Sequence, residues 1–172
     1  MKKIGIFFGS DTGNTEKVAF LIHEQLGNAI SSMFNISEIK KKDIEKYNIL
    51  MFGIPTWYYG ELQCDWEDFL PNFKTMDFKN KTVAFFGCGD QEDYSEYFCN
   101  GMRTIYDLIL KKGAKCIGKW KNEGYSFKSS TALLNEKYFL GLTIDEDRQS
   151  ELTEERVYIW VNSIKKEINL FK

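Results

Sequence analysis

Short, continuously apolar runs alternate along this chain with segments of helical periodicity, and this alternation restricts the fold more than any other feature. Apolar runs occupy about residues 3–8, 49–53 and 82–86, and the stretch 33–38 is a weaker fourth. Runs of this length without polar alternation are typical of parallel strands that are covered on both faces. Strands that alternate with helices favour a parallel sheet with right-handed crossovers.

Four segments place apolar residues at helical spacing and are predicted to form helices. They are residues 13–27, 66–71, 98–113 and 153–168. Pro71 is predicted to end the second helix, because proline lacks the N–H that a helix interior needs. Thr153 is predicted to cap the last helix, whose apolar stripe runs from Val157 to Ile168.

A fifth strand is predicted to begin at about 116–118 and to resume at 138–142 after a polar interruption over 121–137. The chain of 172 residues is long enough for one domain with a sizeable core. We therefore expect a single α/β domain over 1–172, with a doubly wound, five-stranded parallel sheet and helices on both faces.

The loop Gly9–Glu16 joins the first strand to the first helix and is rich in hydroxyl groups, from Ser10, Thr12 and Thr15. A helix N-terminus offers unpaired N–H groups and partial positive charge, which attract anions. The loop holds no Lys or Arg and matches neither the nucleotide-hydrolysing nor the dinucleotide fingerprint. It fits a phosphate that is bound and not transferred, although such residues also favour ordinary helix caps.

Two further loops follow strands and carry flat aromatic side chains, Trp57 and Tyr94. In a doubly wound sheet the ligand lies at the carboxyl ends of the strands, where these loops and Gly9–Glu16 meet. Together they predict a pocket for a phosphorylated planar molecule, with its ring between Trp57 and Tyr94. Cys88, Asp90 and backbone groups near Gly60 and Gly89 are candidates for the ring's polar edge.

Composition narrows the chemistry. The four cysteines show no C-x-x-C spacing, and one histidine, His23, lies within a helical pattern, so neither a metal site nor a hydrolase triad is indicated. Residues 56–96 hold nine acids against three lysines, whereas the whole chain has a net charge of only −2. That acidic zone argues against nucleic acid and for a basic protein partner, with solvated surface as the alternative.

Segments that match a known family extend over nearly the whole chain. They are GSDTGNTE (9–16), PTWYYGELQCDWEDF (55–69), GCGDQEDYSEYF (87–98), GLTIDEDRQSELTEERV (141–157) and the interruption around 121–137. In these segments the chain resembles a flavodoxin of the long-chain type. The resemblance implies the strand order 2-1-3-4-5 and noncovalently bound flavin mononucleotide (FMN). It also implies a low-potential one-electron carrier that replaces or supplements ferredoxin and is not an enzyme.

The resemblance also assigns roles to residues. The phosphate contacts are Ser10, Asp11, Thr12, Gly13, Asn14 and Thr15, and the ring and ribityl contacts are Pro55, Thr56, Trp57, Tyr58, Tyr59, Gly60, Cys88, Gly89, Asp90, Tyr94 and Asp147. The carrier would shuttle between semiquinone and hydroquinone. A carbonyl of the 57–60 turn would accept the new proton if the Tyr58–Tyr59 peptide turned over, and positive φ at Tyr58 would cost about 1 kcal/mol.

Two alternatives come from other classes of protein. One is an FMN-dependent NAD(P)H:quinone reductase, which needs an open face over the ring. The other is a response-regulator receiver, which needs acidic residues at the end of the third strand. In this sequence the third strand ends instead in Gly53-Ile54-Pro55. No apolar run approaches the ~20 residues of a membrane span, and the run after Met1 is too short for a signal peptide. We expect a cytoplasmic monomer whose partners are redox proteins, among them a reductase.

Overall fold

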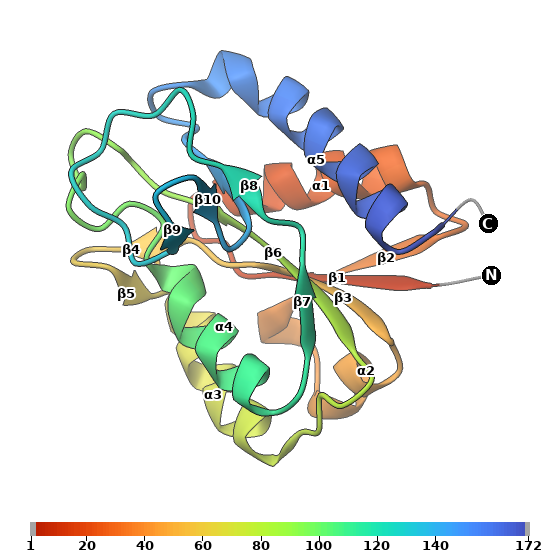
Figure 1. Ribbon diagram of the computed structural model, residues 1–172. Coiled ribbons are helices and arrows are strands. Elements are labelled where there is room, and N and C mark those ends of the chain that lie inside the picture. The colour runs from red at the N-terminus through yellow and green to blue at the C-terminus, as the bar shows by residue number, and fades with distance from the viewer. Residues whose placement is uncertain (1–2, 171–172) are drawn as a thin grey trace.

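The computed structural model describes residues 3–170 and contains the predicted parallel sheet (Figure 1). Its strands lie in the order β2 (Ser31–Asn35), β1 (Ile4–Phe8), β3 (Ile49–Gly53) and β6 (Thr82–Cys88). The fifth position is shared by β7 (Lys115–Ile117), which pairs with Thr82–Ala84, and β11 (Leu142–Ile144), which pairs with Phe86–Cys88. The predicted order 2-1-3-4-5 is confirmed, with the fifth strand in two pieces.

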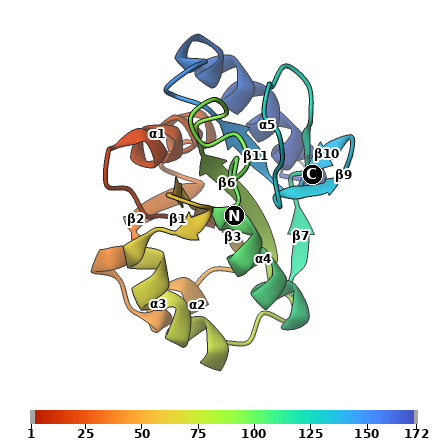
Figure 2. The ribbon, with the colours of Figure 1, turned by 90° about the vertical axis from the view of Figure 1, so that its left-hand side faces the viewer.

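Helices cover both faces of this sheet, as the continuously apolar strands predict. On one face α1 (Asn14–Leu26) packs beside α5 (Thr153–Glu167), and on the other lie α3 (Cys64–Thr75), α4 (Gly101–Lys111) and the short α2 (Lys41–Glu45) (Figure 1, Figure 2). The two faces form separate apolar clusters. Strands β1 and β3 are buried along their whole length, so the sheet is a rigid platform for the loops at its carboxyl edge.

The interruption of the fifth strand forms a structure of its own. After β7 the chain adds an antiparallel sheet of β8 (Trp120–Lys121), β9 (Leu133–Asn135) and β10 (Tyr138–Phe139), in the order β8-β10-β9. The predicted strand 138–142 is therefore wrong as one element, because Phe139 belongs to this small sheet and Leu142 to the large one. Gly141 makes the crossing possible, since a Cβ there would overlap the Phe85 carbonyl oxygen.

Three predicted boundaries are also wrong. Helix α3 does not end at Pro71 but continues to Thr75, because the next turn buries Phe73 completely and this offsets the hydrogen bond that proline cannot make. The weak strand 33–38 lies instead at Ser31–Asn35, and a 3-10 turn, capped by the Asn35 side chain, follows it. Helix α4 begins at Gly101, since Cys99, with φ of 56°, breaks the helical path after Phe98.

The last helix keeps its predicted apolar stripe, and Val157, Trp160, Val161 and Ile164 are all buried. Thr153, however, does not cap it. Thr153 is the first helical residue, and its hydroxyl donates to the Glu146 carboxylate. No helix among residues 3–170 has the length and apolar character that crossing a membrane requires.

Candidate functional site

The loop between β1 and α1 is shaped by close packing beneath it. Gly9 has no room for a side chain, because a Cβ there would come within 2.2 Å of Gln63 Oε1 and 2.7 Å of Trp66. Gly13 takes φ of 91° as the N-cap of α1 and donates its N–H to Ser10 Oγ at 3.0 Å. No side chain caps the first turn of α1, so its N–H groups face the loop without a partner from a capping residue.

The groups around this helix end suit an anion. Thr15 Oγ1 is buried without a hydrogen-bond partner of normal geometry and interacts only weakly with the Cys88 thiol. Thr12 and Asn14 face the adjoining cleft. The nearest lysine along the chain, Lys17, is held by Glu146 at 2.7 Å. The loop therefore offers hydroxyl and amide donors but no free cation, as its sequence predicts.

A small hairpin that the sequence predicts only as a loop forms the second wall. Strands β4 (Thr56–Trp57) and β5 (Glu61–Leu62) pair around the turn Tyr58–Gly60. The Thr56 hydroxyl accepts the N–H of Gly101 at 2.9 Å, which ties the hairpin to the start of α4. The Trp57 and Tyr58 rings pack with centroids 5.8 Å apart.

Tyr58 already adopts φ of 43° in this structure. The left-handed backbone that the sequence argument expected only after a peptide turned over is thus present without that change. A non-glycine residue in this region stores strain of order 1 kcal/mol. Strain at Tyr58 therefore belongs to the resting hairpin.

The loop after β6 forms the third wall. Gly89 donates its N–H to the Ile144 carbonyl at 3.0 Å, and a Cβ on Gly89 would lie 2.9 Å from the Cys99 nitrogen, so this backbone is fixed. Burial raises the pKa of the Cys88 thiol to about 12, which keeps it protonated at neutral pH. Tyr94 is about half exposed at the rim.

Two neighbouring carboxylates at this end titrate in opposite directions. Burial alone would raise the pKa of Asp90, but hydrogen bonds from Arg148 and from the Asp93 and Glu92 N–H groups outweigh it and lower that pKa. Arg148 donates two hydrogen bonds to the Asp90 carboxylate, of 3.2 and 3.1 Å, and this contact raises the arginine's own pKa. Within residues 3–170 no cation pairs with the Asp147 carboxylate, so burial and then the charges of Asp90 and Asp145 raise its pKa.

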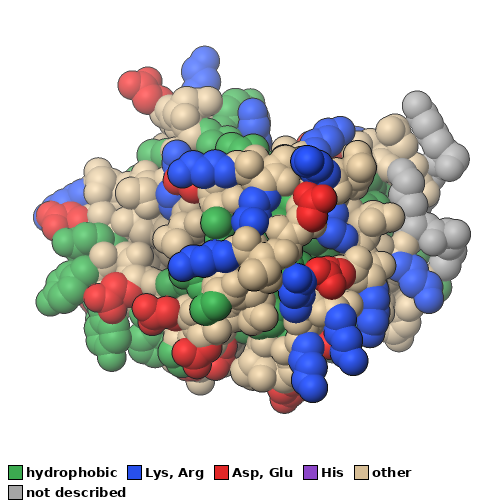
Figure 3. Space-filling view, turned by 90° about the horizontal axis from the view of Figure 1, so that it is seen from below, with side chains coloured by type: hydrophobic (Ala, Val, Ile, Leu, Met, Phe, Trp, Pro, Cys, Tyr) green, Lys and Arg blue, Asp and Glu red, His purple; other side chains and the backbone are tan. Residues whose placement is uncertain are grey.

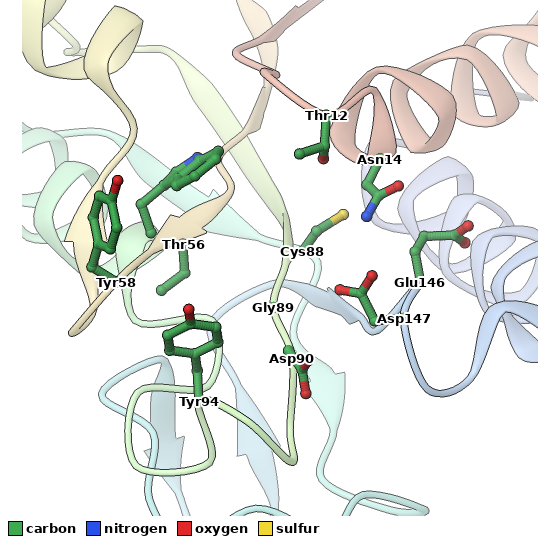
Figure 4. A pocket seen from close by; sticks show the side chains of 11 residues that line it. Thr12, Asn14, Thr56, Tyr58, Cys88, Gly89, Asp90, Tyr94, Glu146 and Asp147 are labelled. Atoms are coloured by element: carbon green, nitrogen blue, oxygen red, sulfur yellow. The ribbon is translucent and has the colours of Figure 1, made fainter.

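These walls enclose one cleft of about 220 Å³ at the carboxyl edge of the sheet. Figure 4 shows Thr12 and Asn14 at the α1 end, Tyr58 and Tyr94 at the opposite side, and Cys88 and Gly89 between them. The cleft is lined by ten predicted residues: Thr12, Asn14, Thr56, Trp57, Tyr58, Cys88, Gly89, Asp90, Tyr94 and Asp147. The three loops thus converge as the sheet topology predicts.

Seven predicted residues lie beside the cleft and do not line it: Ser10, Asp11, Gly13, Thr15, Pro55, Tyr59 and Gly60. Tyr59 is 74% exposed and packs edge-on against Tyr97. The Asp11 carboxylate accepts from Gln63 Nε2 at 3.1 Å. The sequence argument missed Glu146, which lines the cleft next to Asp147; the acidic run 145–147 was the available signal.

The family model for Flavodoxin matches residues 6–160. The chain belongs to the flavodoxin family. Flavodoxin from Buchnera aphidicola (subsp. Acyrthosiphon pisum, strain APS) is 62% identical over 164 residues, 95% of this chain and 96% of that protein. Flavodoxin 1 of Escherichia coli K12 is 55% identical over 166 residues, 96% of this chain and 94% of that one.

A solved structure has a closely similar fold. The crystal structure of Fusobacterium nucleatum flavodoxin bound to flavin mononucleotide has a TM-score of 0.91 and 35% identity, covering 97% of this chain and 99% of that one. The predicted family is confirmed. A flavodoxin is an electron-transfer flavoprotein and not an enzyme with a substrate of its own, so the reductase alternative is not favoured.

Proposed function

We propose that residues 1–172 form a single domain that holds FMN noncovalently in this cleft. The protein carries single electrons between redox proteins, in place of or alongside ferredoxin. The observation that carries the proposal is one cleft with a neutral, hydroxyl-lined helix N-terminus at one end and the aromatic pair Trp57 and Tyr94 at the other. This donor set fits a flat, phosphorylated cofactor.

The phosphate is assigned to the 10–15 loop. The uncapped first turn of α1 supplies N–H groups, and Thr12 and Thr15 supply hydroxyls. The Asp11 carboxylate accepts a hydrogen bond from Gln63. Ser10 accepts the Gly13 N–H, which fixes the bend of the loop. The loop selects the phosphorylated form of the cofactor because a dianion gains most from these unpaired donors.

The ring is assigned to the space between Trp57 and Tyr94. When bound, FMN supplies reversible one-electron chemistry. The chain's part is to stack the ring, exclude water and set its electrostatic surroundings. Asp90, Glu146 and Asp147 line the cleft, and the nearby cations Arg148 and Lys17 are already paired with acids. Added negative charge is therefore poorly compensated, which supports a low potential.

Of the described residues 3–170, no histidine and no cysteine that ionises at neutral pH lines the cleft. The Cys88 thiol stays protonated, and His23 lies in α1, where its Nδ1 is 2.7 Å from Ser31 Oγ. We assign a further role to the backbone of the 58–60 turn, which is exposed at the rim. It would accept a hydrogen bond from the proton that the ring gains on reduction. This arrangement agrees with a carrier that turns over no substrate.

The partners are redox proteins, including a reductase, that dock on the acidic side of the cleft. Glu61, Glu67 and Asp68 are exposed and form no ion pair among residues 3–170. Asp93, in contrast, pairs with Arg148 at 2.8 Å, and Asp65 accepts from Gln63. In Figure 3, which shows the molecule from below, Lys and Arg side chains lie mainly on the right-hand part of the face and Asp and Glu side chains group towards its lower left. This charge separation orients a basic partner toward the flavin.

A direct experiment tests the function. The purified protein is expected to be yellow, to bind one FMN, and to pass electrons from a reductase to an acceptor protein without reducing quinones with NADPH. Steady NADPH–quinone turnover by the protein alone would contradict the carrier assignment.

The free cysteines support a reducing compartment, so we place the protein, as a monomer, in the cytoplasm.

Partner docking has its own test. The double reversal Glu67→Lys/Asp68→Lys is expected to slow association with a reductase and to weaken its dependence on salt, since the Debye length is about 10 Å at 0.1 M. Asp93→Lys serves as a comparison and is expected to have a smaller effect, because Arg148 already offsets part of the charge of the cluster Asp90, Glu92 and Asp93. Stopped-flow rates equal for all three proteins would contradict the docking surface.

A further inference from the structure

Asp145 is a completely buried carboxylate that the cleft does not expose. It lies directly after β11, between the strand and the residues Glu146 and Asp147 that line the cleft. Buried carboxylates need several hydrogen bonds or a cation to offset the loss of water. Among residues 3–170 no salt bridge to Asp145 exists, so neutral donors must satisfy it.

Four N–H groups point at the Asp145 carboxylate, and they come from two different loops. From its own loop, the backbone N–H groups of Asp147 (3.2 Å) and Arg148 (3.0 Å) donate to Oδ1. From the loop after β6, the backbone N–H (3.0 Å) and the side-chain Nε2 (2.9 Å) of Gln91 donate to Oδ2. The Asp145 carboxylate therefore joins the loop of Asp90 and Tyr94 to the loop of Glu146 and Asp147.

Gln91 extends this connection to the insertion. Its side chain is buried, and its Oε1 accepts the Ser126 N–H at 2.5 Å while its Nε2 holds Asp145. Both ends of one amide are thus used, and the amide orientation is fixed by its partners. The insertion is therefore bonded to the loop that carries the proposed ring-stacking side chain.

The insertion makes further bonds along the same loop. The N–H groups of Lys128 and Ser129 donate to the Ser95 carbonyl, and the Ser129 hydroxyl donates to the Glu96 carbonyl at 2.6 Å. Figure 1 shows this part of the insertion, in teal, arching beside the green 90–98 loop. Tyr125 anchors the arch to the main sheet by donating its hydroxyl to the Thr143 carbonyl at 2.6 Å.

We propose that Asp145 is a positioning residue for the ring end of the cleft. With Gln91 as its relay, it holds the Tyr94 loop, the 146–147 loop and the insertion in the arrangement that binds a flat ring. The inference rests on the proposed function, since the ring is that of the cofactor. It adds a role for the insertion, which acts through Ser126 on Gln91 and so on Asp145.

The proposal predicts a distinctive pattern of ligand affinities. In Asp145→Asn an amide N–H₂ replaces one oxygen and faces the N–H groups of Gln91, so the two loops separate. FMN and riboflavin share the ring and differ in the phosphate. Both dissociation constants are therefore expected to rise by the same factor, about tenfold, as for loss of one or two hydrogen bonds to a charged group. The visible circular dichroism of the bound flavin is expected to change as well.

Two other variants make the experiment decisive. Gln91→Met keeps the backbone bond and the side-chain volume but removes the relay, so a smaller equal rise of about threefold is expected. Thr143→Val is the matched control in β11, because its buried hydroxyl has no partner; both affinities are expected to stay at the wild-type values. If Asp145→Asn does not fold, Gln91→Met carries the test alone.

Fluorescence titrations are made far below each variant's unfolding temperature, with near-ultraviolet circular dichroism to verify folding. A purely structural role would lower the unfolding temperature of the flavin-free protein and leave both affinities and the flavin spectrum unchanged, which would overturn the proposal. So would a loss for FMN alone. If the wild type binds neither flavin, the proposed function falls and this inference with it, whereas failure in the variants alone removes only the role of Asp145.

Discussion

The two ends of the cleft, to which we assign the phosphate and the ring of the cofactor, are built in different ways. The phosphate end is local in its donors: Ser10 to Thr15 are consecutive and belong to one strand-to-helix loop, beneath which Gln63 and Trp66 pack. The ring end draws on the 56–60 hairpin, the 88–94 loop, the 145–148 loop and the insertion, which are held together by bonds between residues up to 58 positions apart. A local site can be recognised from a short sequence pattern, whereas a site assembled from distant segments depends on contacts that no pattern records.

If this contrast is right, substitutions at the ring end change the binding of every flavin, and substitutions at the phosphate end change only FMN. The largest effect is expected for Trp57→Ala. Losing a stacked aromatic weakens binding of a flat heterocycle by about 1–3 kcal/mol, so the dissociation constants of FMN and riboflavin should both rise about 5- to 150-fold.

Trp57→Phe is the matched control for Trp57→Ala, because it keeps a flat ring at the same position and should lose much less affinity. Fluorescence titration with the two flavins provides the measurement. A loss for FMN with riboflavin unaffected would place the ring elsewhere and break the contrast between the two ends.

Thr15→Val tests the phosphate end without changing the shape of the side chain. A hydrogen bond to a charged group is worth about 1.5–3 kcal/mol, so the FMN dissociation constant should rise about tenfold or more. Riboflavin affinity should stay constant. The flavin-free protein should not lose stability, because this buried hydroxyl lacks a good partner in the structure. Thr12→Ala should behave similarly towards the two flavins, and equal losses for both flavins would show that the loop has only a structural role.

Tyr58→Gly addresses strain at the ring end. Since Tyr58 has φ of 43° before any flavin is bound, glycine should relieve about 1 kcal/mol in every state of the protein. The first reduction potential of the flavin-loaded protein should then stay close to the wild-type value. Spectroelectrochemical titration checks this. A rise of roughly 40 mV in the first potential alone would instead show that the strain arises on reduction, given 59 mV for each tenfold change.

The smallest effect concerns Asp147 and pH. Its folded-state pKa is raised from 3.8, mainly by burial, so its protonated form favours the fold. That contribution is complete below about pH 3.8 and is lost as pH rises through the raised pKa. Asp147→Asn should therefore stabilise the flavin-free protein at pH 7, by a few tenths of a kcal/mol because the side chain is largely exposed.

Asp90 provides the opposite case within the same pair of loops. Its pKa is lowered, so its stabilising contribution is present above about pH 3.8 and is lost as pH falls. Asp90→Asn should destabilise at pH 7. Urea unfolding at several pH values measures both variants, and changes of the same sign would contradict the assigned environments.

The same contrast between local and distant contacts explains which features of the fold and of the site the sequence predicts. The order of the sheet and the convergence of three loops come from the alternation of apolar strands with helices, and both are confirmed. The predicted end of α3 is wrong because the burial of Phe73 outweighs the local rule that a helix ends at a proline such as Pro71. The 138–142 strand was wrong because its apolar residues serve two sheets.

Within the site, the aromatic and hydroxyl-bearing residues could be predicted because their chemistry is visible in their type. Glu146 and Asp145 could not be distinguished from ordinary surface acids, although one lines the cleft and the other is buried completely. Their roles depend on partners such as Lys17 and Gln91, which lie 129 and 54 residues away. Such pairings arise only when the sheet brings the loop ends together.

The most direct measurement of the central claim is titration of the flavin-free wild-type protein with FMN and with riboflavin, each with and without inorganic phosphate. We predict one binding site for each flavin, tighter binding of FMN by about tenfold or more, and competition by phosphate against FMN. Riboflavin binding should not be weakened by phosphate. Equal affinities for the two flavins, with phosphate without effect on either, would contradict an account in which the α1 N-terminus holds the phosphate and a separately built end holds the ring.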